Sequence, residues 1–304
     1  MLFSDYFMNW VNQYKRDTVR KITLNRYLLT YRQIKELAPN LQLSELNHTS
    51  YQTLINDYAK HHARLTVKNF HHQLKASILD ALNDHLISQD PTRHTVIQGQ
   101  STRKRTNIKY LNLLDLKRLL NQLTLNEEIS IDWLILLIAK TGLRVGEALG
   151  LTKADFDFQN NTLSINKTWD YKSEIGGFAL TKNHYSIRTI QIDPITSDQF
   201  KSLISNMAID QPIFIANGKR VFVATINYRL KKYCRQAQIN PISIHGLRHT
   251  HASLLLYDGV SMTSVAKRLG HSNITTTQNT YMHAIRELEM KDSHKILDNM
   301  IRLA

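Results

Sequence analysis

Six side chains between residues 144 and 281 are of the types that could hold a phosphodiester and attack it. They are two arginines, two histidines, a lysine and a tyrosine, namely Arg144, Lys182, His245, Arg248, His271 and Tyr281. Fixed cations aimed at the charge that develops on phosphate oxygens usually make the largest catalytic contribution. A phenol, with a pKa of about 10, attacks only if its proton is taken up or its developing charge is stabilised. These residue types predict cleavage of a phosphodiester by a tyrosine nucleophile.

Spacing places several of these residues together. His245 and Arg248 are three residues apart at the predicted start of a helix, so both side chains share one face. The start of a helix also carries free amide groups and partial positive charge, which suit an anion. Arg144 follows an apolar helix predicted over residues 130–141, and Glu147 is expected to orient a neighbouring cation. The alternative for Arg144 and Glu147 is a local surface ion pair that contributes about 0.3–0.5 kcal/mol.

The other three residues lie near predicted turns. Lys182 is at a predicted hairpin turn, where it could donate a proton to a leaving alkoxide or be an ordinary exposed lysine. A short helix over residues 262–269 is predicted to end at Gly270, and His271 follows directly. Tyr281 comes ten residues after His271, so we expect both side chains to reach the same phosphate. The sequence offers no carboxylate cluster for magnesium, so we expect neither a metal nor another cofactor.

The composition favours a polyanionic partner. The chain has 304 residues, 42% of them hydrophobic, and a formal net charge of +14. This length suits one large or two ordinary domains, and such a basic chain usually meets nucleic acid. Its single cysteine, Cys234, rules out an internal disulfide and fits a reducing compartment. The N-terminus lacks the pattern of a signal peptide, and the most apolar stretch, residues 131–139, is too short to span a bilayer. We therefore expect a cytoplasmic protein without a membrane segment.

The chain is predicted to form two domains. Apolar residues at helical spacing predict four helices within residues 1–92, a compact bundle. Residues 93–111 are polar and basic and lack this spacing, which predicts an interdomain linker. The linker contains four cations that could lie along a phosphate backbone: Arg103, Lys104, Arg105 and Lys109. The alternative is an ordinary exposed hinge.

Residues 112–304 are predicted to form a second, α+β domain. Helices are expected near residues 113–123, 130–141, 197–207 and 225–238. Alternating apolar residues between 161 and 192 predict a small antiparallel sheet. The C-terminal segment, residues 285–303, has a plausible apolar helical face.

Three strings carry a resemblance to the tyrosine recombinases of the phage integrase family. They are TGLRVGEALGL, IHGLRHTHAS and LGHSNITTTQNTYMH, and they occur in the family's order and spacing. The resemblance covers nearly the whole chain. It implies a mainly α fold, with an N-terminal four-helix SAM-like core-binding bundle and an α+β catalytic domain containing a small antiparallel sheet.

The resemblance also implies an activity, a site-specific recombination of DNA for integration, excision or inversion. Tyr281 would form a 3′-phosphotyrosyl bond, Arg144, Arg248, His245 and His271 would activate the phosphate, and Lys182 would be the general acid. The implied partners are double-stranded DNA with inverted-repeat core sites and three further subunits in a homotetramer on that DNA, the free protein being a monomer or weak oligomer. A directionality factor is a further partner that the resemblance allows. The C-terminal tail would dock on the next subunit or fold on its own domain.

The chain also departs from the family. Many integrases carry a further arm-binding domain in front of the bundle, whereas this sequence opens directly into what resembles the bundle. We expect either a chain trimmed at its start or a naturally short member of the family. Several histidines fall outside the family pattern, and packed or exposed roles are expected for them rather than zinc binding: His61, His62, His71, His72, His249 and His251. The alternative functions are a DNA-relaxing enzyme of the type IB topoisomerase kind with the same covalent chemistry, and a non-catalytic helical DNA-binding regulator.

Overall fold

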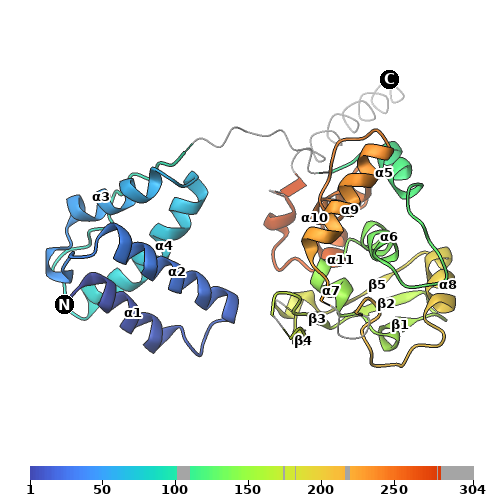
Figure 1. The fold of residues 1–304 in the computed structure, drawn as a ribbon, viewed down its shortest axis with the longest axis horizontal. Helices are drawn as coiled ribbons and strands as arrows, with labels where there is room; N and C mark the ends of the chain where they lie inside the picture. Colours follow the sequence, from blue (N-terminus) through green and yellow to red (C-terminus); the bar gives the residue numbers. More distant parts are fainter. Residues whose placement is uncertain (101–109, 174, 182, 216–219, 279, 282–304) are drawn as a thin grey trace, which may run out of the picture. The chain divides into compact units, whose positions relative to one another are not determined.

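The computed structural model describes residues 1–100, 110–173, 175–181, 183–215, 220–278 and 280–281. The chain divides into two compact units, Met1–Thr106 and Asn107–Ala304 (Figure 1). The four arginines and lysines expected to contact DNA from the linker, Lys182 and the C-terminal tail all lie outside the described residues. None of the helices in the described ranges has the length and apolar content needed to cross a membrane.

The first unit is the four-helix bundle that the sequence predicts. Its helices are α1 (Phe3–Tyr14), α2 (Lys21–Leu37), α3 (His48–Ala59) and α4 (Arg64–Asn83), with a short 3₁₀ turn η1 (Leu43–Glu45) between α2 and α3. Their apolar faces meet in one core that includes Phe7, Ile55 and Leu74. Helix α3 begins at His48, because the Asn47 side chain accepts hydrogen bonds from Thr49 N and Ser50 N.

Part of the expected linker is attached to this bundle. Gln52 in α3 donates from Nε2 to Val96 O and accepts from Val96 N through Oε1, both at 2.9 Å. Gln100 N donates to His62 O at 2.8 Å. Residues 96–100 therefore lie along the first unit, although their sequence has no helical or strand pattern.

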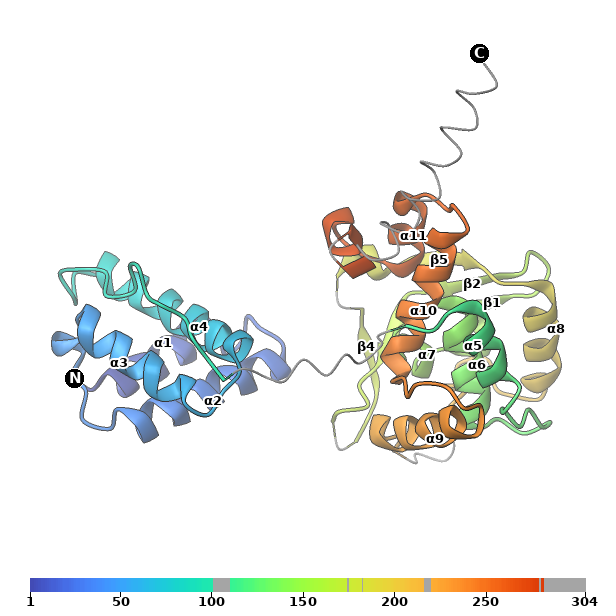
Figure 2. The ribbon, with the colours of Figure 1, turned by 90° about the horizontal axis from the view of Figure 1, so that it is seen from above.

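Helices form most of the second unit. They are α5 (Leu113–Leu120), α6 (Ile131–Thr141), α7 (Val145–Leu149), α8 (Pro194–Leu203), α9 (Val223–Gln236), α10 (Ile244–Tyr257) and α11 (Met262–Leu269), with 3₁₀ turns η2 (Lys153–Asp155) and η3 (His184–Ser186). Helix α6 lies inside the unit with α10 packed alongside (Figures 1 and 2). Nearly every residue of α6 is buried, so its continuous apolar sequence reflects a core helix.

The predicted antiparallel sheet between residues 161 and 192 is divided into two small sheets, one of which also includes a strand before residue 161. Strands β1 (Phe156–Asp157), β2 (Thr162–Ile165) and β5 (Arg188–Gln191) form one sheet in the order β1-β2-β5. Strands β3 (Lys167–Trp169) and β4 (Phe178–Leu180) form the other, with Trp169 opposite Phe178. The mainly helical fold with a small antiparallel component is therefore confirmed, and the sheet order brings β5 against β2, within reach of α11.

Candidate active site

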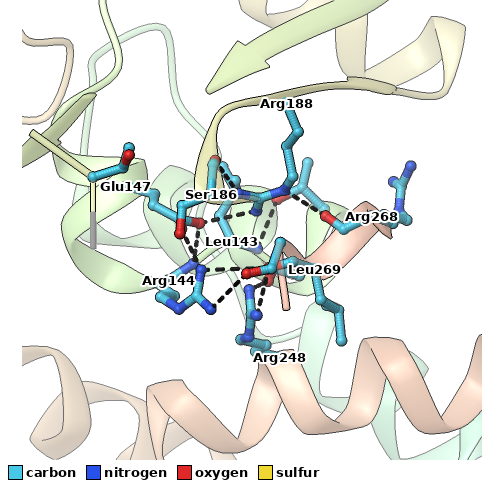
Figure 3. A network of polar contacts seen from close by, with 12 residues as sticks. Leu143, Arg144, Glu147, Ser186, Arg188, Arg248, Arg268 and Leu269 are labelled. Atoms are coloured by element: carbon cyan, nitrogen blue, oxygen red, sulfur yellow. Dashed lines mark hydrogen bonds and ion pairs between the residues drawn. The ribbon is translucent and has the colours of Figure 1, made fainter. Parts of the chain in front are cut away.

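Two of the predicted arginines meet at the C-terminal end of α11 (Figure 3). Arg144, which precedes α7, donates from Nη1 to Leu269 O at 3.4 Å and from Nη2 to Gly270 O at 3.2 Å. Arg248 in α10 donates from Nη2 to Leu269 O at 2.6 Å and from Nη1 to Gly142 O at 2.7 Å. The last carbonyls of a helix lack partners within the helix and carry partial negative charge, so cations stabilise this end.

A third arginine, Arg188, joins them from the first residue of β5. It donates from Nε to Arg268 O at 2.6 Å and from Nη1 to Ser186 O at 2.9 Å. Its Nη2 donates to Glu147 Oε2 at 2.9 Å, and its side chain is only 7% exposed. Arg188 was not among the residues predicted from the sequence. A signal was nevertheless present, because residues two apart in a strand share a face and Ile190 of the same strand is buried.

The buried Glu147 carboxylate links two of the arginines. Its Oε1 accepts from Arg144 Nη1 at 2.6 Å, and its Oε2 also accepts from Arg144 N at 3.0 Å. Burial acts to raise the pKa of this carboxyl, but the charges of Arg188, Arg144 and Arg248 outweigh burial and lower the pKa below its ordinary value. The ionised Glu147 is thus more than a partner in a surface ion pair, since it fixes Arg144 and Arg188 together.

Two glycines allow the backbone turns at this cluster. Gly142 ends α6 and Gly270 ends α11, and both adopt a left-handed conformation, with φ of 70° and 67°. A Cβ atom at Gly270 would lie 2.9 Å from Arg188 Nη1, and one at Gly142 would lie 2.7 Å from the His251 ring. The predicted end of the short helix at Gly270 is therefore confirmed, and both turns also require the close approach that only glycine permits.

The cluster carries an excess of positive charge. Arg144, Arg188 and Arg248 contribute three positive charges and Glu147 one negative charge, which leaves two positive charges. Burial, followed by the charge of Arg144, lowers the pKa of Arg248 to about 9, so this guanidinium remains charged at neutral pH. The Arg144 side chain is 29% exposed and can be approached from solvent. Such a cluster suits a phosphodiester whose negative charge increases during attack.

His271 lies at this cluster as a neutral ring. Its Nε2 is 3.1 Å from Arg248 Nη2, and its Nδ1 is 2.7 Å from Thr277 Oγ1. Because a guanidinium can only donate, Nε2 accepts and the ring proton is on Nδ1, directed at Thr277. Burial, followed by the charges of Arg248 and Arg144, lowers the pKa of His271 to about 4. The structure thus brings His271 to Arg248, as its position after the turn predicts.

His245 occupies the first turn of α10, on the same face as Arg248. Burial of the ring, followed by the charges of Arg248 and Arg144, lowers its pKa from the ordinary value. Part of the His245 side chain is nonetheless exposed to solvent, which leaves it accessible to a ligand. Its ring meets the ring of His249 edge to face, with 4.8 Å between centroids.

Tyr281 lies against α10 and is buried, with 1% of its surface exposed. Its hydroxyl is 3.2 Å from His249 Nδ1. Burial raises the pKa of Tyr281 to about 12, although Arg248 and Arg144 act in the opposite direction. The sequence predicts a tyrosine presented to a phosphate, whereas the structure has the phenol packed inside the unit but within the electrostatic influence of both arginines.

His251 is a second residue of α10 that supports the cluster. Arg268 Nε donates to its Nε2 at 2.9 Å, and its Nδ1 is 3.1 Å from Ala139 O. Burial, followed by the charge of Arg268, lowers the pKa of His251 to about 3, so the ring is neutral. This histidine is packed, as expected for the histidines outside the family pattern. Among the described residues, no group of three or more His, Cys, Asp and Glu side chains could hold a metal ion.

Comparison with known sequences identifies relatives of this chain. Residues 109–287, more than half of the chain, match the model of the Phage integrase family. The integrase of Staphylococcus phage L54a is 27% identical over 296 residues, which cover 84% of this chain and 82% of that protein. The Tn916 transposase of Enterococcus faecalis is 26% identical over 257 residues, which cover 77% of this chain and 62% of that protein.

Solved structures share the fold. The Tn1549 transposon integrase in complex with transposon right end DNA matches with a TM-score of 0.77 and 18% identity, over 96% of this chain and all of that chain. A lambda integrase dimer bound to a COC′ core site matches with a TM-score of 0.65 and 15% identity, over 92% of this chain and 95% of that chain. Both similarities extend over both units of the chain.

Proposed function

The chain belongs to the phage integrase family and is a tyrosine-type site-specific recombinase, and we propose that Tyr281 is its nucleophile. The observation that carries the proposal is the convergence of Arg144 and Arg248 on one helix end, beside the segment that leads to Tyr281. A guanidinium fork held by buried partners loses little freedom when it binds phosphate oxygens.

In the proposed reaction, the Tyr281 oxygen attacks the phosphorus of a DNA phosphodiester. A P–O bond to Tyr281 forms as the bond to the 5′ oxygen breaks, and the phenol proton leaves while the 5′ oxygen gains one. Arg144 and Arg248 bind the two nonbridging oxygens, and the two excess positive charges offset the charge that accumulates there. The 5′ hydroxyl of a partner strand then reverses the step, so no external energy source is needed.

The other predicted residues have roles that follow from their sequence positions. We assign His245 and His271 to hydrogen bonding or proton transfer at the phosphate, and Lys182 to protonation of the 5′ oxygen. Glu147 and Arg188 act through Arg144, which they hold by the shared carboxylate. Because His271 Nε2 faces Arg248, we propose that it acts first as an acceptor that orients this arginine.

The proposed partner is double-stranded DNA with inverted-repeat core sites. Residues 1–92 would be the core-DNA-binding domain, 93–111 the basic interdomain linker and 112–304 the catalytic domain with its tail. The net charge of +14 supports binding to a polyanion, which should weaken as salt rises because phosphate contacts release counterions. We further propose that four subunits assemble on DNA and exchange their C-terminal tails. The proposal also includes a directionality factor and action at the nucleoid.

A duplex nicked beside the cleavage point tests the nucleophile, because the short leaving strand diffuses away and traps the adduct. We expect a covalent protein–DNA adduct with the wild type and none with Tyr281→Phe, although both bind the duplex. An adduct in the Phe variant would exclude Tyr281 from this role. Binding without any adduct in the wild type would instead favour a DNA-binding regulator, and relaxation of a supercoiled plasmid without strand exchange would favour the topoisomerase alternative.

A further inference from the structure

The contact between Tyr281 and His249 is not explained by the roles assigned so far. His249 follows Arg248 in α10, and its Nδ1 lies 3.2 Å from the Tyr281 hydroxyl. The two rings meet edge to face, with centroids 5.6 Å apart and planes inclined by 61°. On its other side, His249 meets the ring of His245. Three aromatic side chains therefore form a row along the helix that also supplies Arg248.

The Tyr281 ring fills an apolar pocket between two helices. It packs with Ala252 and Leu256 of α10 and with Val265 and Leu269 of α11. A DNA phosphate must come within bonding distance of the phenol oxygen to be attacked. With only 1% of its surface exposed, Tyr281 cannot be approached by a duplex in this position. The attack therefore requires the ring to leave the pocket.

The polar contact with His249 stabilises the buried position. A hydroxyl taken into apolar surroundings costs free energy unless it finds a hydrogen-bond partner, and the His249 nitrogen is such a partner. We propose that His249 is a positioning residue that holds Tyr281 in the pocket and thereby limits the fraction of enzyme able to attack. The inference rests on the proposed role of Tyr281 as nucleophile.

The row of rings also connects this contact with the phosphate site. His245 is exposed at the start of α10, near Arg248, where the substrate phosphate would bind. Ring contacts thus run from His245 to His249, whose Nδ1 meets the Tyr281 hydroxyl.

A pair of substitutions at His249 tests the proposal kinetically. His249→Phe keeps an aromatic ring but removes the nitrogen, whereas His249→Asn can place an amide oxygen near the same position. With saturating nicked duplex, we expect the first-order rate of adduct formation to rise about 5- to 30-fold in the Phe variant and to stay near the wild-type rate in the Asn variant. The affinity for DNA should not change. An unchanged or lower rate in the Phe variant would overturn the proposal.

A matched control comes from the first unit. Tyr51 Oη lies 2.9 Å from His71 Nδ1, also in buried surroundings, so His71→Phe removes the same kind of contact away from the reaction. We expect His71→Phe to leave the rate of adduct formation on saturating DNA unchanged. An equal acceleration in this variant would show a general loosening of the protein and would overturn the assignment to His249.

The exposure of residue 281 to solvent can also be measured directly, which tests the proposal even if a variant loses its cleavage activity. With 3-fluorotyrosine at position 281, a gadolinium chelate in solution should relax the fluorine signal little in the wild type and more in His249→Phe. Equal protection in both would overturn the proposal whatever the cleavage rate. If the wild type forms no adduct, the proposed function fails. If the wild type forms it and both measurements are insensitive to His249, only this inference fails.

Discussion

The two units of the molecule bury different chemistry. Among the residues that the structure describes, the first unit buries no lysine, arginine, aspartate or glutamate, and its core is apolar apart from a few hydroxyl groups and His71. The second unit buries Asp132, Glu147, Asp155 and Arg248. Moving a charge out of water costs several kcal/mol unless it is paired and hydrogen-bonded. The second unit therefore bears the free-energy cost of burying charged side chains. At Glu147, this cost goes with holding Arg144 and Arg188 in fixed positions.

The two units also differ in the charges that surround a buried tyrosine–histidine pair. The Tyr51–His71 and Tyr281–His249 pairs have similar geometry, with ring centroids 5.9 and 5.6 Å apart. Burial raises the pKa of both phenols, but Asp90 raises that of Tyr51 further, whereas Arg248 and Arg144 act to lower that of Tyr281. The surrounding charges therefore distinguish a packed tyrosine from one suited to become an anionic nucleophile.

The largest effect should follow from removing the shared carboxylate. Glu147→Ala leaves Arg144 and Arg188 without their partner inside the unit, and we expect the free energy of unfolding to fall by about 3–5 kcal/mol. Urea unfolding of the full chain, followed by tryptophan fluorescence, measures it. A loss below 1 kcal/mol would mean that the buried charges of the second unit are no costlier to disrupt than surface charges.

The next effect concerns catalysis rather than stability. Arg248→Lys keeps a positive charge but loses the planar fork, so the rate of adduct formation should fall by about 10²- to 10³-fold while most DNA binding remains. Arg235→Lys, the same change at an exposed position in α9, is the control and should leave the rate unchanged. If binding falls as much as cleavage, Arg248 is a general DNA contact and not part of the reaction site.

A smaller loss is expected at the residue that sequence reasoning missed. Arg188→Lys cannot reach Glu147, Arg268 and Ser186 together, so Arg144 loses part of its support. We expect adduct formation to slow by about 5- to 30-fold with unchanged affinity for DNA. A change confined to the unfolding free energy would make Arg188 purely structural.

Acid should weaken the second unit through its neutral histidines. The pKa of His271 is about 4 in the folded protein, below its ordinary value of 6.5, so the unfolded chain binds this proton more readily. The stability from neutral His271 is present above pH 6.5 and is lost as the pH falls towards 4. His271→Gln cannot be protonated, so its melting temperature should fall less over this range. Superimposable pH profiles for wild type and variant would contradict this assignment.

The smallest effect should come from a charge pair on the surface of the bundle. Lys60 Nζ lies 2.7 Å from Asp57 Oδ1, and the lysine side chain is 67% exposed. Asp57→Ala should lower the free energy of unfolding by less than about 1 kcal/mol, because solvent and salt screen such pairs. Urea unfolding compares it directly with Glu147→Ala. A loss as large as that of Glu147→Ala would remove the contrast between the two units.

Local patterns predicted much of the fold. The four bundle helices, the core helix α6 and the end of α11 at Gly270 all follow from the spacing of apolar residues and from turn residues. The predicted starts of helices were less accurate, as at α8, which begins at Pro194 rather than near residue 197 because Asp193 caps it. The predicted antiparallel sheet is confirmed, but local alternation did not show that its strands divide into two sheets, β1-β2-β5 and β3-β4.

The amino-acid sequence by itself determined which residue types are available and that His245 and Arg248 share one face of a helix, because neighbours along a helix are set by local geometry. The grouping of His271 and Tyr281 with them is what the family resemblance implies. Only the tertiary structure decided that Arg188 shares a carboxylate with Arg144, and that Tyr281 is buried against His249. The Arg188–Glu147 and Arg248–Gly142 bonds join residues 41 and 106 positions apart. Such contacts depend on how whole elements pack, which no local spacing specifies.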